Sequence, residues 1–198
     1  PVMLRITRYE ENYIGRGRPG FQAWTRFGVR EDGKITAIDL YIIQDNGPYG
    51  RSGDYQTAGV VTDLMYQPDA MRFRGITIYT NTPPRAAMRG PGGAQIVAML
   101  EPLVDKAARE LGIDRVAIRR MNVPDSDSRF GPNRGQLTGA FVREAIDAGA
   151  EKFGWAEKSQ LSGQRSGTKV MGVGVGVSPY VGGSSGFDGL LLIRPDGK

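Results

Sequence analysis

The sequence contains no cysteine and no histidine among its 198 residues. The absence of cysteine excludes disulfide bonds and thiolate metal sites, and the absence of histidine excludes imidazole ligands from this chain. It also excludes serine or cysteine nucleophiles that depend on a histidine base. A metal centre could still be present if a cofactor brings its own ligands.

Long hydrophobic runs are also lacking. No apolar segment approaches the roughly 18 residues of a membrane span, and the first ten residues, PVMLRITRYE, do not form a signal peptide. The 39% hydrophobic and 24% charged residues are typical of a globular protein with a sizeable core. The chain opens without methionine, as if within a strand, so we expect a segment excised from a longer, cytoplasmic polypeptide, with a periplasmic parent as the alternative.

Charge and glycine content narrow the choice of partners. The net charge of +5 is compatible with a solvated surface in a larger protein, or with an anionic partner such as nucleic acid or a phosphorylated cofactor. Basic residues are scattered and aromatic residues make up only 9%, so nucleic acid is weakly supported. The 29 glycines, about twice the usual share of roughly 7%, indicate tight turns or close backbone approach.

Apolar–polar alternation predicts strands in the first part of the chain. We expect one strand over residues 1–9, two strands within residues 21–47 around the turn Glu31–Lys34, and another over residues 71–80. The Asp-Gly pair in that turn favours a tight hairpin. Residues 47–69 are predicted to be irregular.

Helical periodicity is found after the predicted strands. Residues 92–112 have an apolar face typical of a helix, and Pro102 predicts a kink or two helical pieces. Asp114 is placed to cap a second helix through Met121.

A third helix is expected over residues 138–155, with Phe141, Ala145 and Phe153 among its buried side chains. Two strands around a glycine–serine turn are expected in residues 168–198. These elements predict an α+β fold with mixed or antiparallel strands and about three helices.

The segment Thr80–Gln95, TNTPPRAAMRGPGGAQ, is called the corner below. Its glycines would let backbone N–H groups approach an anion, the following helix would direct its positive end there, and Arg89 could add a planar donor fork. The alternative is a plain strand-to-helix turn with one surface arginine. The string RGPGG matches neither a P-loop nor a dinucleotide-binding fingerprint.

Other candidate residues favour structural roles. Glu101 and Asp105 are interpreted as a helix-surface charge and a packing anchor rather than as catalytic groups. Gly172, Gly174 and Gly176 lie on one face of an expected strand, which predicts tight packing against a neighbouring element. The run at residues 124–135 lacks the spacing of a calcium loop.

The corner and its surroundings resemble a known family. Thr80-Asn81 followed by AMRGPGGAQ is similar to the TN…AFRGFGGPQ segment of the xanthine oxidase family, in its molybdopterin-binding large subunit. The run MLEPLVDKAARELGIDRVAIRRMN is similar to that family's ALESLIDEIARELGIDPxELRRxN. The resemblance extends over nearly the whole chain, as a partial molybdopterin-binding domain with a strand-rich part at 1–80, the cofactor loop and helices at 81–155, and a second strand-rich part at 168–198.

The resemblance implies a molybdenum–molybdopterin cofactor, whose pterin supplies the sulfur ligands that this chain lacks. In that family, an activated oxygen attacks an electron-poor carbon, a hydride passes to sulfur, and water replenishes the oxygen. Electrons leave through iron–sulfur clusters to FAD or another acceptor on other domains or subunits. The cofactor performs this chemistry and the protein positions it.

The resemblance also implies site residues. Arg89 corresponds to the arginine beside the molybdenum, and Gly90, Gly92 and Gly93 to the residues that keep the loop close to the cofactor; Arg85 is at a variable position.

The family's two pocket aromatics are replaced by Pro91 and, approximately, Pro179-Tyr180. The purine-orienting arginine falls near Thr57, with Arg51 as the nearest basic residue. We therefore expect an aldehyde or an aromatic N-heterocycle as substrate rather than xanthine.

The family's catalytic glutamate is expected beyond Lys198, so no catalytic residue is assigned here and the isolated segment is expected to be inactive. Two alternatives remain open at this point. One is a basic module that binds nucleic acid or another polyanion, and the other is a non-catalytic scaffold segment.

Overall fold

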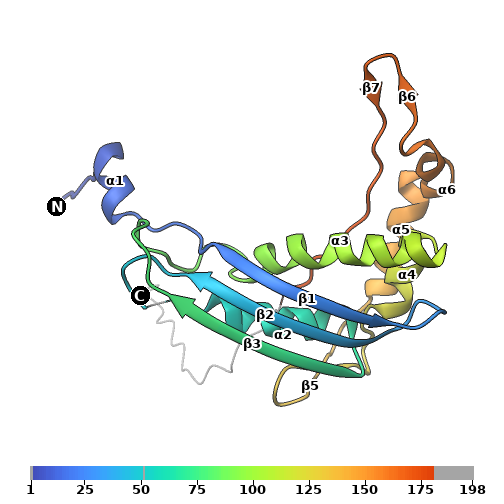
Figure 1. Ribbon diagram of the computed structural model, residues 1–198, viewed down its shortest axis with the longest axis horizontal. Coiled ribbons are helices and arrows are strands. Elements are labelled where there is room, and N and C mark those ends of the chain that lie inside the picture. Colours follow the sequence, from blue (N-terminus) through green and yellow to red (C-terminus); the bar gives the residue numbers. More distant parts are fainter. Residues whose placement is uncertain (1, 51, 181–198) are drawn as a thin grey trace, which may run out of the picture.

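The computed structural model describes residues 2–50 and 52–180. Its main sheet has the strand order β1-β2-β3, with β1 at Phe21–Val29, β2 at Ile35–Asp45 and β3 at Ala70–Ile78 (Figure 1). β1 and β2 are antiparallel, whereas β3 is parallel to β2 and is reached through helix α2, Asp54–Tyr66. A parallel pair needs such a crossover, because a tight turn can join only antiparallel neighbours.

The predicted hairpin is confirmed. The Arg30 N–H donates to the Lys34 carbonyl at 2.9 Å, and the Gly33 N–H donates to the Arg30 carbonyl at 2.9 Å. The Asp32 side chain accepts from the Lys34 N–H at 3.0 Å, which closes the turn from inside.

The remaining elements surround this sheet. Along the chain, helix α1 precedes the sheet, and α3 and α4 follow it. Two small two-stranded ribbons come next, and α5, α6 and a short 3-10 helix lie between them in the sequence. Their bounds are α1 Arg8–Ile14, α3 Gly93–Leu111, α4 Arg115–Asn122, β4 Arg129–Phe130, β5 Gly135–Gln136, α5 Val142–Phe153, α6 Trp155–Lys158, η1 Ser159–Leu161, β6 Arg165–Ser166 and β7 Lys169–Val170. No helix in the described ranges is both long enough and apolar enough to cross a membrane.

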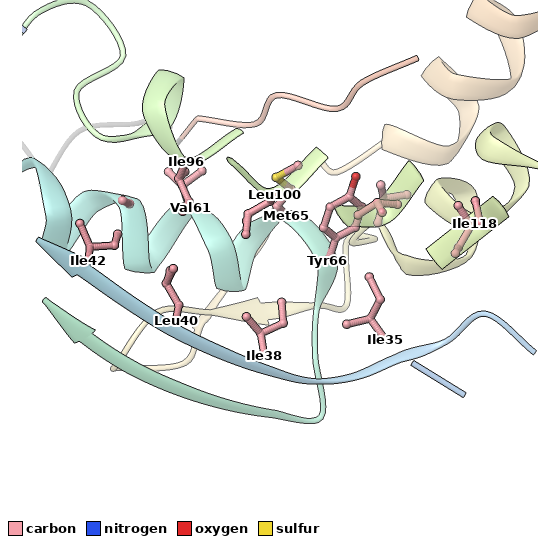
Figure 2. Close-up of a cluster of buried hydrophobic side chains, with 14 residues drawn as sticks. Ile35, Ile38, Leu40, Ile42, Val61, Met65, Tyr66, Ile96, Leu100 and Ile118 are labelled. Atoms are coloured by element: carbon pink, nitrogen blue, oxygen red, sulfur yellow. The ribbon is translucent and has the colours of Figure 1, made fainter. Parts of the chain in front are cut away.

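The core lies between one face of the sheet and helices α2 and α3 (Figure 2). Alternation along β2 directs every second side chain toward these helices. Fully buried apolar side chains from β2, α2, α3 and α4 meet there, including Ile38, Leu40, Ile42, Val61, Met65, Ile96, Leu100 and Ile118. Burial of each stabilises the fold by about 1.5–3 kcal/mol.

The predicted α+β class is confirmed, and of the expected mixed or antiparallel arrangements the main sheet is mixed. The prediction of a strand over residues 1–9 is wrong. Residues 2–7 form no strand, and α1 follows them. The Glu10 N–H donates to the Thr7 hydroxyl at 3.2 Å, and the Thr7 N–H donates to the Glu10 carboxylate at 2.7 Å. This capping box starts a helix where alternation alone suggested a strand.

The prediction of an irregular segment at residues 47–69 is also wrong, because α2 occupies most of it. Its start has no side-chain cap and its sequence contains β-branched residues and an internal glycine, which weaken local helix propensity. Its buried residues Ala58, Val61, Thr62 and Met65 nevertheless follow helical spacing. Packing against the sheet stabilises a helix that propensity does not favour.

Further differences concern the helical half. Pro102 predicted a kink or two helical pieces; helix α3 is continuous through it, so the second alternative is wrong. The described residues contain six α-helices instead of about three. Asp114 caps α4 as predicted, accepting from Val116 and Ala117 N–H groups at 2.8 and 3.0 Å.

The expected burial along α5 is not observed. Phe141 is 68% exposed and Phe153 is 44% exposed, and Ala145 is exposed as well. The reason is that α5 packs on α4 and α6 at the edge of the main core, where Val142 and Ile146 contact the core and remain half-buried.

The C-terminal part of the described structure also differs from the prediction. Residues 171–180 form no strand, and the rest of the expected strand pair lies outside the described residues. A Cβ on Gly172 or Gly174 would meet no atom within 4 Å, so the tight packing predicted for these glycines is absent from the described structure. Gly176 alone of the three packs closely, with Glu101 Oε2 at 3.2 Å from a Cβ built there.

Candidate functional site

The corner is attached to the end of β2 through Asp45. The Asp45 carboxylate accepts hydrogen bonds from the hydroxyls of Thr80 and Thr82, from the Gly47 N–H at 2.9 Å and from Arg85 Nε at 3.1 Å. Burial acts to raise the pKa of Asp45, but these donors outweigh it and hold the pKa below its ordinary value. Arg85, whose Nη2 lies 2.9 Å from the same carboxylate, is therefore a structural cation.

A second attachment comes from Arg18, in the link between α1 and β1. Its guanidinium donates to the carbonyl oxygens of Arg89 at 2.5 Å and Gly90 at 3.0 Å, and to Gln95 Oε1 at 3.3 Å. The Gln95 amide donates to the Pro19 carbonyl at 3.1 Å. Arg18 thus holds the backbone of the Arg89–Gly90 pair in place.

Two glycines join the corner to neighbouring elements. Gly92, with φ +72°, precedes α3 and lies on the first turn of α2, where a Cβ would stand 2.1 Å from the Asp54 carbonyl oxygen and 2.8 Å from Ala58 N. Gly93 lies against the Tyr180 ring, whose nearest carbon would be 3.1 Å from a Cβ. The fold therefore brings Tyr180 beside this glycine pair.

Arg89 and Gly90 have a more open environment. Gly90 has φ +71°, and a Cβ built on it meets no atom within 4 Å. The Arg89 side chain is exposed, and its guanidinium makes no hydrogen bond or ion pair within residues 2–50 and 52–180.

The start of α3 adds partial positive charge, since neither an acidic residue nor a side-chain cap occupies its first turn. An oxygen-rich or anionic group fits this arrangement. Arg89 would be its donor, and Gly90 would permit close approach.

The other predicted pocket residues lie at or next to this corner. Pro91 is half-buried between the two glycines with positive φ. Thr57 is half-buried on α2, next to the Ala58 that contacts Gly92. Arg51 lies outside the described residues.

A buried ionic network joins α2, α3 and α4. The Arg119 guanidinium, with a fully buried side chain, donates from Nε to Glu101 Oε2 at 2.8 Å, and its Nη1 lies 2.8 Å from Asp105 Oδ1 in ion-pair contact. The Tyr66 hydroxyl donates to Glu101 Oε1. Burial raises the pKa of Tyr66, and the neighbouring Glu101 charge raises it further.

This network also anchors the chain that leads to Tyr180. The Val177 N–H donates to Glu101 Oε2 at 3.2 Å, and Arg115 Nη1 donates to the Val173 carbonyl at 2.7 Å. Glu101 is thus an internal counter-ion and anchor, and its interpretation as a helix-surface charge is wrong.

Sequence reasoning missed Arg18 and Asp45. Arg18 lies in the string GRGRPG, which resembles a solvated link, and nothing local indicates that it reaches residues more than 70 positions away. Asp45 begins the triplet Asp-Asn-Gly, a turn signature in which the aspartate accepts from the N–H two residues later. That signal predicts the Gly47 contact but not the contacts with the corner.

The Asp45 contacts predict a pH dependence of stability. Because the folded-state pKa is lowered, the contribution of Asp45 is fully present above the ordinary aspartate pKa of about 3.9 and is lost as pH falls through the lowered value. We expect urea unfolding between pH 7 and pH 2 to show a smaller acid-induced loss in Asp45→Asn than in the parent. Identical pH profiles for the two proteins would contradict this assignment.

Comparison with known proteins identifies the family. A family model described as the molybdopterin cofactor-binding domain matches residues 1–123, which is more than half of the chain. The chain belongs to the molybdopterin cofactor-binding domain family. This confirms the resemblance drawn from the corner and α3, and it does not favour the polyanion-binding alternative.

Curated relatives support the same assignment. The chain is 29% identical over 182 residues to a xanthine dehydrogenase molybdenum-binding subunit of Escherichia coli O157:H7, covering 91% of this chain and 24% of the relative. It is 35% identical over 180 residues to the aldehyde oxidoreductase molybdenum-binding subunit PaoC of Escherichia coli strain K12, covering 88% and 23%. The chain thus spans about a quarter of the length of these relatives.

Solved structures share the fold. Quinoline 2-oxidoreductase from Pseudomonas putida 86 superposes with a TM-score of 0.68 at 25% identity, over 78% of this chain and 21% of that one. The aldehyde oxidoreductase from Desulfovibrio desulfuricans ATCC 27774 gives a TM-score of 0.63 at 26% identity, over 73% and 16%. Both names describe oxidoreductases, and in both the match is to a fraction of the chain.

Proposed function

We propose that this chain forms the cofactor-contacting part of the large subunit of a molybdenum hydroxylase. The whole protein would oxidise an aldehyde or an aromatic N-heterocycle with water as the oxygen source. The observation that supports this most directly is the exposed Arg89 guanidinium beside the open space at Gly90, within a chain of this family. When bound, the cofactor supplies the redox chemistry and the transfer of oxygen.

The protein's own contribution is positioning and charge. Arg89 would donate hydrogen bonds to the oxygen ligands of the metal, and Gly90, Gly92 and Gly93 would let the backbone lie close to the cofactor. Arg18 would keep the Arg89–Gly90 backbone in place, because its guanidinium already binds both carbonyl oxygens. A preorganised donor is effective because the site needs little rearrangement when charge develops.

The substrate pocket would be bordered by Pro91, Tyr180 and Thr57. Tyr180 is the sole aromatic side chain among these three, so a small or singly stacked substrate suits this border better than a purine held between two rings. The catalytic glutamate, the iron–sulfur clusters and a flavin or other acceptor would be supplied by parts of the protein outside this chain. The parent would act in the cytoplasm.

Replacing Arg89 tests the proposed function. In the full-length parent, Arg89→Ala should lower both molybdenum content and turnover by roughly 10- to 100-fold, as expected when a group that orients a metal site is removed. Molybdenum is measured by elemental analysis of the purified protein, and turnover with a panel of aldehydes and N-heterocycles.

The matched control is Arg165→Ala. Arg165 is exposed on β6, in the ribbon that projects from the body of the molecule (Figure 1). It should keep normal molybdenum content and turnover. If Arg89→Ala also retains both, the corner serves only as scaffold and the proposed function is wrong for these residues.

A further inference from the structure

The face of the main sheet that turns away from α2 and α3 has an ordered surface. Residues in register on neighbouring strands share a face. The register therefore places three rows across β1, β2 and β3, which together are called the outer face: Arg26–Asp39–Arg72, Trp24–Tyr41–Arg74 and Gln22–Ile43–Ile76. The surface changes from charged through aromatic to aliphatic along the strands.

The middle row is a preassembled stack. The Trp24 and Tyr41 rings have centroids 5.5 Å apart with an interplanar angle of 20°, and the Arg74 guanidinium carbon lies 4.1 Å from the Tyr41 centroid. Because β1 and β3 flank β2, Trp24 and Arg74 approach Tyr41 from opposite sides. Tyr41 is thus held between them, while Trp24 remains 51% exposed.

The charged row and the stack leave an excess of positive charge. Arg72 donates from Nε to Asp39 Oδ1 at 2.8 Å, so the single carboxylate of the outer face is already paired. Arg26 and Arg74 are exposed and make no ion pair within the described part of the chain. A hollow of about 590 Å³, lined in part by Trp24, Arg26 and Tyr41, lies among these side chains.

We propose that the outer face docks a separate protein chain through a segment that carries carboxylates beside apolar side chains. The carboxylates would pair with Arg26 and Arg74, and apolar side chains would occupy the hollow and cover Ile43 and Ile76. Tryptophan, tyrosine and arginine are the residues enriched at the energetic centres of interfaces between chains. Because these side chains are already stacked on one another, they lose less conformational entropy when a partner docks.

Two other occupants fit the outer face less well. Nucleic acid strands bind by stacking successive bases on several free aromatic rings, but both faces of Tyr41 are covered and Trp24 is the one exposed ring of the stack. A second copy of this chain, docked face to face, would set the unpaired arginines of one copy against those of the other, which is electrostatically unfavourable. Charge complementarity therefore favours an acidic protein segment.

Site-specific photo-crosslinking in the full-length parent tests the proposal. The photo-reactive residue p-benzoylphenylalanine is placed at Gln22, which is exposed at the edge of the stack, and cells are irradiated before the crosslinked peptides are sequenced by mass spectrometry. We expect a covalent product with a different polypeptide, at a segment that contains aspartate or glutamate among apolar residues. The same probe at Lys106, which is exposed on α3, should not give that product.

Charge reversal provides the second measurement. Arg26→Glu combined with Arg74→Glu should lower the yield of this product at least about tenfold, since like charges across an interface cost several kcal/mol. Lys106→Glu should leave the yield unchanged, and raised salt should lower it in the parent.

If the double variant fails to fold, Trp24→Ala and the salt series test the same contact. Crosslinks solely to the same polypeptide, to a second copy or to nucleic acid would overturn the proposal. The absence of any crosslink, or a yield insensitive to charge and salt, would do the same. None of these readouts depends on molybdenum content or turnover.

Discussion

Arg119→Ala should lower the free energy of unfolding by about 3–5 kcal/mol, because it removes the cation from between Glu101 and Asp105 and leaves the largely buried Glu101 carboxylate uncompensated. The Arg119 side chain is fully buried, so water cannot replace the lost contacts without opening the interface of α3 and α4. The Tyr66 hydroxyl would remain as a donor to Glu101 but cannot neutralise it. Urea denaturation at pH 7 measures the loss.

The adjacent arginine is a matched control. Arg120 makes an ion pair with Asp147 at 2.7 Å, but both side chains are about half exposed. Arg120→Ala should therefore cost no more than about 1 kcal/mol, since exposed pairs contribute little. Similar losses for the two variants would show that burial of Arg119 does not determine its energetic importance.

Gly92→Ala is expected to have the second large effect, about 3–5 kcal/mol, by combining backbone strain with overpacking. Gly92 has φ +72°, a conformation that residues with a Cβ rarely adopt, and the Cβ would lie 2.1 Å from the Asp54 carbonyl oxygen. A backbone atom cannot rotate away as a side chain can, so the corner must separate from α2. Denaturant unfolding measures the loss, and molybdenum content should also fall in the parent.

Gly90→Ala separates strain from packing. Gly90 has nearly the same φ, +71°, but no atom lies within 4 Å of a Cβ built there. Its stability cost should therefore be about 1–2 kcal/mol, the cost of positive φ alone. If Gly90→Ala destabilises as much as Gly92→Ala, the close approach to α2 is not the reason for glycine at position 92.

The two glycine variants also bear on the proposed function. A methyl group at Gly90 would project into the space where we place the cofactor, so Gly90→Ala should lose molybdenum while remaining largely folded. The predicted pattern is thus a large loss of stability at one glycine and a loss of cofactor with a modest loss of stability at the other. A Gly90→Ala protein with normal molybdenum content would place the cofactor elsewhere.

Much of the fold could be predicted where the signals were local. The β1–β2 hairpin follows from alternation on both sides of an Asp-Gly turn. Helix α4 begins at Asp114, whose side chain caps the next two N–H groups. Thr7 and Glu10 form the capping box that starts α1, but the apolar–polar alternation before them indicates a strand, so the sequence signals conflict there.

Other features depend on contacts between distant parts of the chain. α2 is a helix because its apolar residues pack on the sheet, which outweighs a weak local propensity. The burial of α5 could not be judged from its periodicity, since an apolar stripe indicates a face but not how deeply that face enters the core.

The amino-acid sequence by itself determined the hairpin, the α3–α4 pair, the glycine- and arginine-rich composition of the corner, and the resemblance by which the family was recognised. These depend on residues a few positions apart, whose turn, capping and periodic preferences act locally. Only the tertiary structure decided that Arg18 and Asp45 hold the corner, that Tyr180 lies on Gly93 and that Arg119 is buried between two carboxylates. Each of these contacts joins different elements, so it forms only when burial of the shared core brings those elements together.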